Sequence, residues 1–274
     1  MINNKIQHKY HLVNPSPWPF FCSIALFCVA IAFVMFMHNK SFAGILLTLS
    51  ACGVVFVLFS WWQDVIKEGK DEKAHTNVVS SGLKYGVALF ILSEIVFFAV
   101  FFASFFKASL DPVHILDNSL WPTLKSSWPP EGIATLDPWN IPFLNTLVLL
   151  LSGTTVTWAH YSLIENDQQN LIRALLITVL LGVFFTLLQI YEYHHATFKF
   201  KDGIYPSNFY MATGFHGFHV IVGTIFLFIC YLRAKAGHFT KNLGHLGFEF
   251  AAWYWHFVDV VWLFLFTFVY VLGR

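Results

Sequence analysis

The sequence predicts an all-α membrane protein. Of its 274 residues, 57% are hydrophobic and only 11% are charged, whereas soluble domains carry about 25% charged residues. Seven apolar stretches are long enough to cross the roughly 30 Å hydrocarbon core of a bilayer as helices. Strands are not expected, because lipid-facing backbone must satisfy its hydrogen bonds within helices. The net charge of +1 provides no basic surface, so we expect no nucleic-acid partner.

The predicted helices divide into a group of two and a group of five. Residues 1–17 end in the proline-rich NPSPWP and form an extended polar lead-in, because closely spaced prolines prevent an earlier helix. A two-helix membrane bundle, 18–63, follows. The next stretch, 64–79, contains DVIKEGKDEK and is interpreted as a solvated linker, or alternatively as a contact with headgroups or a partner. The remaining part, 80–274, forms a five-helix membrane bundle. The seven helices are predicted over about 18–37, 42–63, 80–106, 141–161, 171–194, 208–233 and 246–271.

A long loop, about 107–139, separates the third and fourth helices. It is too long to be a simple connection. Its residues Trp121, Trp128 and Trp139 predict a cap that lies on the membrane surface or on a partner. Seven spans place the termini on opposite sides of the membrane, and the side of the N-terminus holds most of the 16 Lys and Arg. The positive-inside rule therefore predicts that the N-terminus lies on the matrix or cytoplasmic side.

The last predicted helix combines a membrane-spanning length with several polar side chains. Its sequence GFEFAAWYWHFVDVVWLFLF contains Glu249, His256 and Asp259. Polar groups in hydrocarbon usually face the interior of a bundle and pair there. His256 and Asp259 lie three residues apart, so we expect them to pair with each other or with Glu249. We interpret this helix as the seam against which other helices, or a partner protein, pack.

Two further groups of polar residues lie in the middle of helices. Glu94, in LFILSEIVFF, is either a proton relay or a neutral acid hydrogen-bonded to a neighbouring helix, and we favour the second. His216 and His219 share a helix face. That spacing can serve a metal or a haem, but the small residues around them favour close helix contact with both histidines as interhelical hydrogen-bonding groups. We expect no metal site in this chain.

Other polar residues lie near predicted helix ends, where wet headgroups are the expected partners: His160, Glu192, His194 and His195. The four cysteines lie in apolar segments without a CxxC pair, which predicts free buried thiols. Physical reasoning leaves three classes open, namely a transporter or channel, a receptor-like bundle, and a non-catalytic subunit of a membrane complex.

Several longer motifs resemble those of the cytochrome c oxidase subunit III family. They occur in the family's order, cover nearly the whole chain, and include NPSPWPF, WWQDVIKE, LKYGVALFILSEIVFF, WPPEGI, PFLNTLVLLLSG, QIYEY, FYMATGFHGFHVIVGT and AAWYWHFVDVVWLFLF. Seven predicted helices favour this family over the five-helix third subunits of quinol oxidases.

The resemblance implies a core subunit of a haem–copper oxidase that passes electrons from cytochrome c to oxygen, makes water and pumps protons. Haems and coppers are then expected in subunits I and II, with none in this chain, which itself has no catalytic centre. The expected partners are subunit I as the main contact, subunit II, accessory small subunits and bound phospholipids. The family's two helices and five helices form a V whose cleft holds lipid. The expected location is the mitochondrial inner membrane, or alternatively a bacterial inner membrane.

The resemblance also assigns residues by motif. Glu94 matches the family's buried acid of the third helix, and Asp259 and His256 match positions of the last helix. Four further residues match positions around the lipid cleft: Trp62, Lys67, His75 and Arg233. The family's third subunit steadies the oxidase over many turnovers, helps proton entry and offers oxygen a route.

The chain departs from the family pattern at two places. Gln63 stands where Arg usually follows the tryptophan pair, and the segment 233–238 keeps its Arg but shifts its Lys. Both departures affect the expected headgroup contacts. The alternative function is an independent transporter or proton channel that uses Glu94 and Asp259.

Overall fold

The computed structural model describes residues 13–70, 76–110, 128–130, 132–239 and 245–274. These residues form helices and connecting turns without any strand, which confirms the predicted all-α class. The chain divides into two compact units, residues 1–83 and 84–274. Helix α3 (Asn77–Leu110) begins in the first unit and continues in the second.

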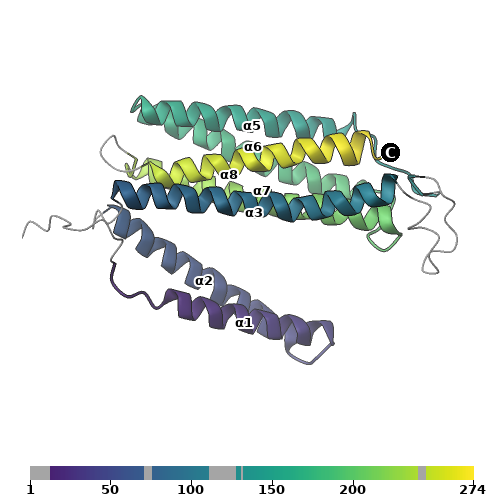
Figure 1. Ribbon diagram of the computed structural model, residues 1–274, viewed down its shortest axis with the longest axis horizontal. Helices are drawn as coiled ribbons and strands as arrows, with labels where there is room; N and C mark the ends of the chain where they lie inside the picture. Colours follow the sequence, from purple (N-terminus) through teal and green to yellow (C-terminus); the bar gives the residue numbers. More distant parts are fainter. Residues whose placement is uncertain (1–12, 71–75, 111–127, 131, 240–244) are drawn as a thin grey trace, which may run out of the picture. The chain divides into compact units, whose positions relative to one another are not determined.

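In the first unit, α1 (Trp18–Met37) packs against α2 (Ala43–Lys70) (Figure 1). Pro19 lies in the first turn of α1, where its missing N–H would have no helical partner in any case. Near the other end of α2, Asp64 accepts a hydrogen bond from the Trp18 indole. Helix α2 ends at Lys70, so it extends into the stretch 64–79 that we predicted from the sequence as a linker.

The second unit holds the remainder of α3 and a bundle of four further helices. These are α5 (Ile141–Ile164), α6 (Gln168–His195), α7 (Ile204–Lys235) and α8 (Leu246–Phe264), which continues as the π-helix η1 (Leu265–Val271). Helix α5 contacts α6 and α8, and α7 contacts both α6 and α8. Helix α3 contacts α7 and α8 through aromatic side chains: the ring centroids of Phe97 and Phe215 of α7 lie 5.1 Å apart, and those of Phe98 and Phe257 of α8 lie 6.1 Å apart.

Local sequence sets the ends of these helices. The Asp167 side chain accepts a hydrogen bond from the backbone N–H of Asn170 at 3.0 Å and so caps the first turn of α6. Gly237 follows α7 with φ of +69°, a left-handed conformation that suits glycine at the end of a helix. Most predicted helices are extended by a few residues at one or both ends.

Helix α8 is the most buried candidate span of the described chain. Its Trp255 has no exposed surface and lies against Gly182 of α6 and Gly223 of α7, where added Cβ atoms would approach the ring to 2.9 and 2.8 Å. The Trp255 indole N–H also donates to Ser152 Oγ of α5 at 2.9 Å. One side chain of α8 thus contacts three other helices, which agrees with the interpretation of this helix as a seam.

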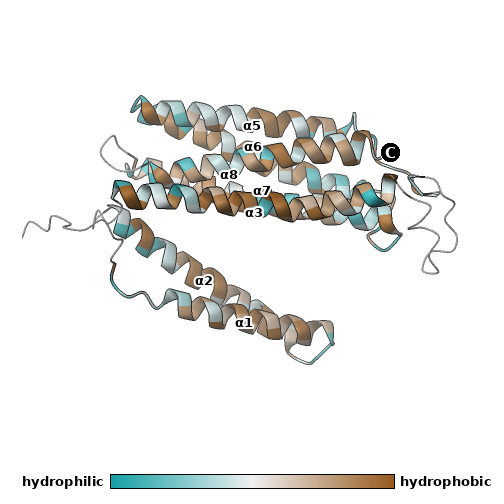
Figure 2. Cartoon of the chain, viewed as in Figure 1, coloured by the Kyte–Doolittle hydropathy of each residue, from teal (hydrophilic) through white to brown (hydrophobic). Residues whose placement is uncertain are grey.

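The outer surfaces of the helices are apolar. The described residues include seven helices that are long and apolar enough to cross a membrane. Hydrophobic colours run along these helices in Figure 2, with hydrophilic colours more frequent at helix ends and connections. Exposed apolar surface on this scale requires cover by lipid or by a partner.

The end of the long loop packs on the chain itself. Trp128 donates from its indole N–H to the carbonyl oxygen of Gly273 at 3.1 Å, and its ring lies 5.4 Å from Phe105 and 5.6 Å from Tyr205. Trp139, in contrast, is 58% exposed. Trp121 lies outside the described residues. Of the two described tryptophans of the predicted loop, Trp128 is therefore half-buried against the core of the bundle and Trp139 is exposed.

Candidate functional site

Glu94 and His219 form a pair between α3 and α7. The Glu94 Oε2 atom lies 2.9 Å from His219 Nε2, and the two side chains are 21% and 8% exposed. The other ring nitrogen, Nδ1, lies 2.7 Å from the carbonyl oxygen of Phe215. Because a carbonyl oxygen can only accept, Nδ1 carries a proton. The contact between Nε2 and Oε2 then holds a single further proton, which resides on either the carboxyl or the imidazole.

Aromatic rings surround the imidazole of this pair. The His219 ring centroid lies 5.0 Å from that of Phe98, and it is stacked on Tyr254 at 6.3 Å. Such apolar surroundings lower the local dielectric around the imidazole and strengthen the hydrogen bond. Glu94 thus makes a hydrogen bond to a neighbouring helix, as in the interpretation that we favoured from the sequence. Its side chain is only partly buried within this chain.

Glu249 pairs with a residue that the sequence did not suggest. Its Oε2 atom lies 2.7 Å from Lys84 Nζ, and the side chains are 22% and 43% exposed. This ion pair joins the beginning of α8 to α3. Glu249 is therefore not the partner of His256 or Asp259.

His256 and Asp259 face each other, as one of the predicted pairings required. His256 Nδ1 lies 3.5 Å from Asp259 Oδ2, and His256 Nε2 lies 3.3 Å from Thr157 Oγ1 of α5. The Asp259 side chain can lie this close to α5 because residue 153 is a glycine, where an added Cβ would collide with the Asp259 carboxylate. The pair thus lies at the contact between α5 and α8.

His216 and His219 contact different helices. His216 is buried, and its Nε2–H donates to the carbonyl oxygen of Val258 in α8 at 3.2 Å, whereas His219 meets Glu94 of α3. Within the described ranges, no group of three or more His, Cys, Asp and Glu could hold a metal. The two histidines act as separate interhelical contacts in this structure.

The four residues predicted around a lipid cleft are placed as follows. Arg233 lies at the end of α7 with its guanidinium 4.8 Å from the centre of the Phe239 ring. The buried Arg233 Nε has no hydrogen-bond partner among the described residues. Trp62 and Lys67 are exposed on α2 in the first unit. His75 lies outside the described residues, and the grouping of the four stays a prediction.

A comparison with known proteins places the chain. The family model for cytochrome c oxidase subunit III matches residues 8–274. The probable cytochrome c oxidase subunit 3 of Rickettsia felis is 62% identical over 267 residues, which cover 97% of this chain and 96% of the relative. The corresponding proteins of Chondrus crispus and Dugong dugon are 51% and 50% identical, covering 99% and 97% of this chain and 97% and 98% of theirs.

The chain belongs to the cytochrome c oxidase subunit III family. The resemblance seen in its motifs is therefore confirmed. A subunit III is part of an oxidase complex with other subunits, and the seven apolar helices make this chain an integral membrane protein.

One polar residue of this subunit III chain was assigned wrongly from sequence. Glu192 was expected among headgroups because it lies near the end of α6, but it is only 2% exposed. Its Oε1 accepts hydrogen bonds from the Tyr270 hydroxyl at 2.6 Å and from Gln189 Nε2 at 3.2 Å. The spacing of Gln189 and Glu192 in QIYEY, three residues apart on one helix face, was the available signal.

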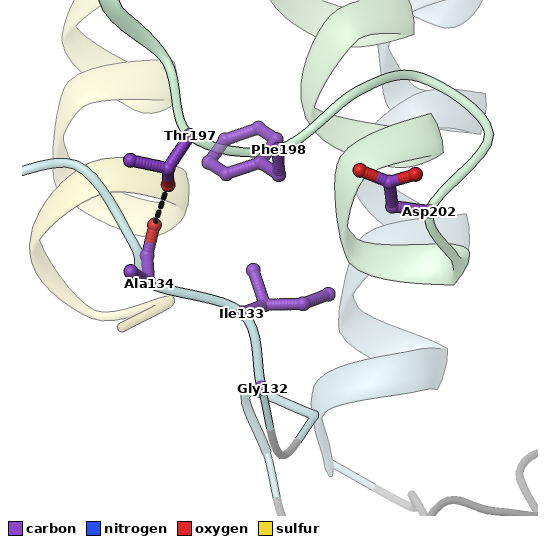
Figure 3. A pocket seen from close by; sticks show the side chains of 6 residues that line it. All are labelled: Gly132, Ile133, Ala134, Thr197, Phe198 and Asp202. Atoms are coloured by element: carbon purple, nitrogen blue, oxygen red, sulfur yellow. Dashed lines mark hydrogen bonds between the residues drawn. The ribbon is translucent and has the colours of Figure 1, made fainter.

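Two hollows are lined by residues other than those predicted as functional from the sequence. A cavity of about 300 Å³ is lined by a loop and the connection between α6 and α7 (Figure 3): Gly132, Ile133, Ala134, Thr197, Phe198 and Asp202. Thr197 Oγ1 donates across it to the carbonyl oxygen of Ala134 at 3.1 Å. The Asp202 carboxylate accepts from the backbone N–H of Lys199 at 2.6 Å. A second, apolar groove of about 320 Å³ lies on α7.

Proposed function

We propose that this chain is a non-redox core subunit of the oxidase, which steadies the catalytic subunit, binds phospholipid, and aids proton uptake and oxygen delivery. The observation that carries the proposal is that polar side chains of the chain are used for contacts between its own helices. Glu94, Glu249, His216 and Trp255 each contact another helix of the same chain. Membership of the subunit III family adds the oxidase complex as the setting.

The haems and coppers are assigned by this proposal to partner subunits I and II. The support is the arrangement of the histidines, because His216 turns to α8 while His219 turns to α3. A shared ligand position would require both rings to face one point. In the proposed complex, subunit I is the main contact, with subunit II and small subunits as further partners.

Phospholipid binding is supported by Arg233. Its Nε is buried and has no hydrogen-bond partner in the described parts of the chain. A buried N–H of a cationic group forms its strongest hydrogen bond with an anionic acceptor, such as a headgroup phosphate. Lys67 and Trp62 are exposed on α2 and available to a headgroup. A cationic side chain near an anionic membrane surface contributes about 1 kcal/mol. His75 completes the proposed set.

The proposed orientation places the N-terminus on the matrix or cytoplasmic side, on the basis of the Lys and Arg distribution. Eukaryotic relatives at 50–52% identity support the mitochondrial inner membrane. The higher identity of the Rickettsia relatives, 60–62%, supports a bacterial inner membrane. In both cases the same face is proposed for the N-terminus.

The alternative is an independent membrane transporter or proton channel that uses Glu94 and Asp259. These acids have separate partners, since Glu94 meets His219 and Asp259 meets His256. Purification of the tagged chain from its membrane separates the two functions. Haem absorbance and oxygen uptake that co-purify with the chain support the oxidase subunit. A chain that purifies alone, and whose ion flux in liposomes is lost in Glu94→Gln, contradicts it.

A further inference from the structure

A sealed polar cluster joins α5, α6 and the π-helix η1. It consists of Asn145 from α5, Gln189 and Glu192 from α6, and Tyr270 from η1, with exposures of 0, 5, 2 and 2%. The Tyr270 ring is flanked by Phe209 at 5.3 Å and Trp262 at 5.8 Å. The cluster is therefore enclosed by aromatic rings, and none of the residues predicted as functional from sequence belongs to it.

Hydrogen bonds run through the cluster in one direction and leave two oxygen atoms without a donor. Asn145 Nδ2 donates to Gln189 Oε1 at 3.3 Å, and Gln189 Nε2 donates to Glu192 Oε1 at 3.2 Å. The Tyr270 hydroxyl donates to the same Oε1 atom at 2.6 Å. The two remaining oxygens, Glu192 Oε2 and Asn145 Oδ1, are buried and have no partner among the described residues.

The cluster contains an acid but no cation. None of the Lys, Arg and His side chains in the described chain forms an ion pair with Glu192. The groups hydrogen-bonded to its carboxyl are the Gln189 amide of its own helix and the Tyr270 hydroxyl of η1, and Asn145 of α5 reaches it through Gln189. The Tyr193 and Tyr205 phenols also lie close enough to interact with its charge, and neither is a cation. An ionised carboxylate in such a site keeps one bare oxygen away from water, which costs several kcal/mol.

Exchange of the amide oxygen and nitrogen positions does not remove the need for a proton. The orientation of an Asn or Gln amide is assigned from its hydrogen bonds. If both amides are turned over, Gln189 Nε2 donates to Asn145 Oδ1, and Gln189 Oε1 then faces Glu192 Oε1. Two oxygens at that distance require a proton between them. In the other assignment, a proton on Glu192 Oε2 replaces a buried, bare anionic oxygen by a neutral hydroxyl.

We infer that Glu192 is a proton-binding site: it is a neutral carboxylic acid enclosed in this cluster. The bound proton supplies the charge neutralisation that no cation of the cluster provides. The neutral acid accepts from Tyr270 and so fastens the π-helical end of the chain to α6. The π-type hydrogen bond from Leu272 N to the carbonyl oxygen of Thr267, at 3.0 Å, lies in the same segment.

Infrared spectroscopy of the assembled oxidase tests this inference. The wild-type minus Glu192→Gln difference spectrum at neutral pH is expected to show the loss of a protonated carboxyl C=O band. Glu165→Gln is the matched control, because Glu165 is exposed in the turn between α5 and α6, and its difference spectrum is expected to show the loss of carboxylate bands. Loss of carboxylate bands in Glu192→Gln would overturn the inference.

A second pair of variants keeps the test decisive if Glu192→Gln fails to assemble. Asn145→Leu removes an amide from the cluster, and Tyr270→Phe removes the hydroxyl that donates to the acid. Each is expected to shift the protonated C=O band, because its hydrogen bonds change. A protonated band that stays at the same frequency in both variants belongs to another acid and contradicts the assignment to Glu192.

Discussion

The indole ring of Trp255 lies against Gly223 so closely that a Cβ at position 223 would be 2.8 Å from Cε3 and 3.0 Å from Cζ3. Trp255 is fully buried and its N–H is held by Ser152. The ring therefore cannot move aside to make room for a larger residue. The contact between α7 and α8 depends on the absence of a side chain at position 223.

The first prediction concerns this contact. We expect Gly223→Ala to destabilise the bundle by about 1–3 kcal/mol, the usual cost of overpacking a core. Gly217→Ala is the matched control on the same helix, because nothing lies within 4 Å of its added Cβ. Thermal inactivation of the purified oxidase measures both. Equal inactivation rates for the two variants would contradict the predicted role of Gly223.

The second prediction concerns Glu94 and His219. In Glu94→Gln the side-chain amide can still donate to His219 Nε2, whereas Glu94→Ala leaves that nitrogen without a partner. We expect the alanine variant to lose about 1–3 kcal/mol of stability and the glutamine variant much less, measured by thermal inactivation of the oxidase.

Infrared spectra of the same variants report the position of the shared proton. We expect Glu94 to be neutral, so the difference spectrum of Glu94→Gln should lack carboxylate bands. An ionised carboxylate at neutral pH that vanishes in Glu94→Gln would place the proton on His219 instead.

The third prediction concerns Arg233. We expect Arg233→Ala to lower the bound phospholipid and to shorten the lifetime of the oxidase in turnover more than it lowers the initial rate. Because the guanidinium also lies over Phe239, Phe239→Leu serves as the control that removes the ring and keeps the cation. Lipid analysis of the purified variants separates the effects. Unchanged phospholipid content in Arg233→Ala would contradict lipid binding at this residue.

The fourth prediction concerns the long loop. Trp128→Phe keeps an aromatic ring against the core but removes the hydrogen bond to Gly273, so we expect a loss of about 0.5–1.5 kcal/mol and faster proteolytic cleavage between α3 and α5. Trp139→Phe, at an exposed position, should leave the cleavage rate unchanged. Limited proteolysis of the membrane-bound oxidase compares the two. A loop that is cleaved equally fast in both variants would show that Trp128 is not its anchor.

Most of the helices could be predicted because apolar length and the bilayer leave little choice of backbone structure. The bounds of α1 were predicted correctly, and the extension of α2 to Lys70 was not. The charged stretch after residue 63 resembles a linker in composition, but charged residues are compatible with a helix once its backbone leaves the hydrocarbon. The arrangement of two helices and five around a lipid cleft stays a prediction.

Pairings between distant residues were harder to predict. The spacing of His256 and Asp259 indicated their contact because both lie on one helix face. The partners of Glu249 and Glu94, which are Lys84 and His219, come from helices far away in sequence. Glu192 was assigned to the headgroup region because it lies near a helix end, and its burial follows from η1, whose Tyr270 covers it.

The sequence by itself determined the class, the membrane spans and the family, because hydropathy is local and the subunit III motifs run along nearly the whole chain. Only the tertiary structure decided what the last helix does with its polar side chains. Glu249 binds α3, His256 and Asp259 meet α5, and Trp255 fills the space left by two glycines. A side chain's partner depends on which helix lies opposite it, and helix periodicity fixes only the face on which it lies.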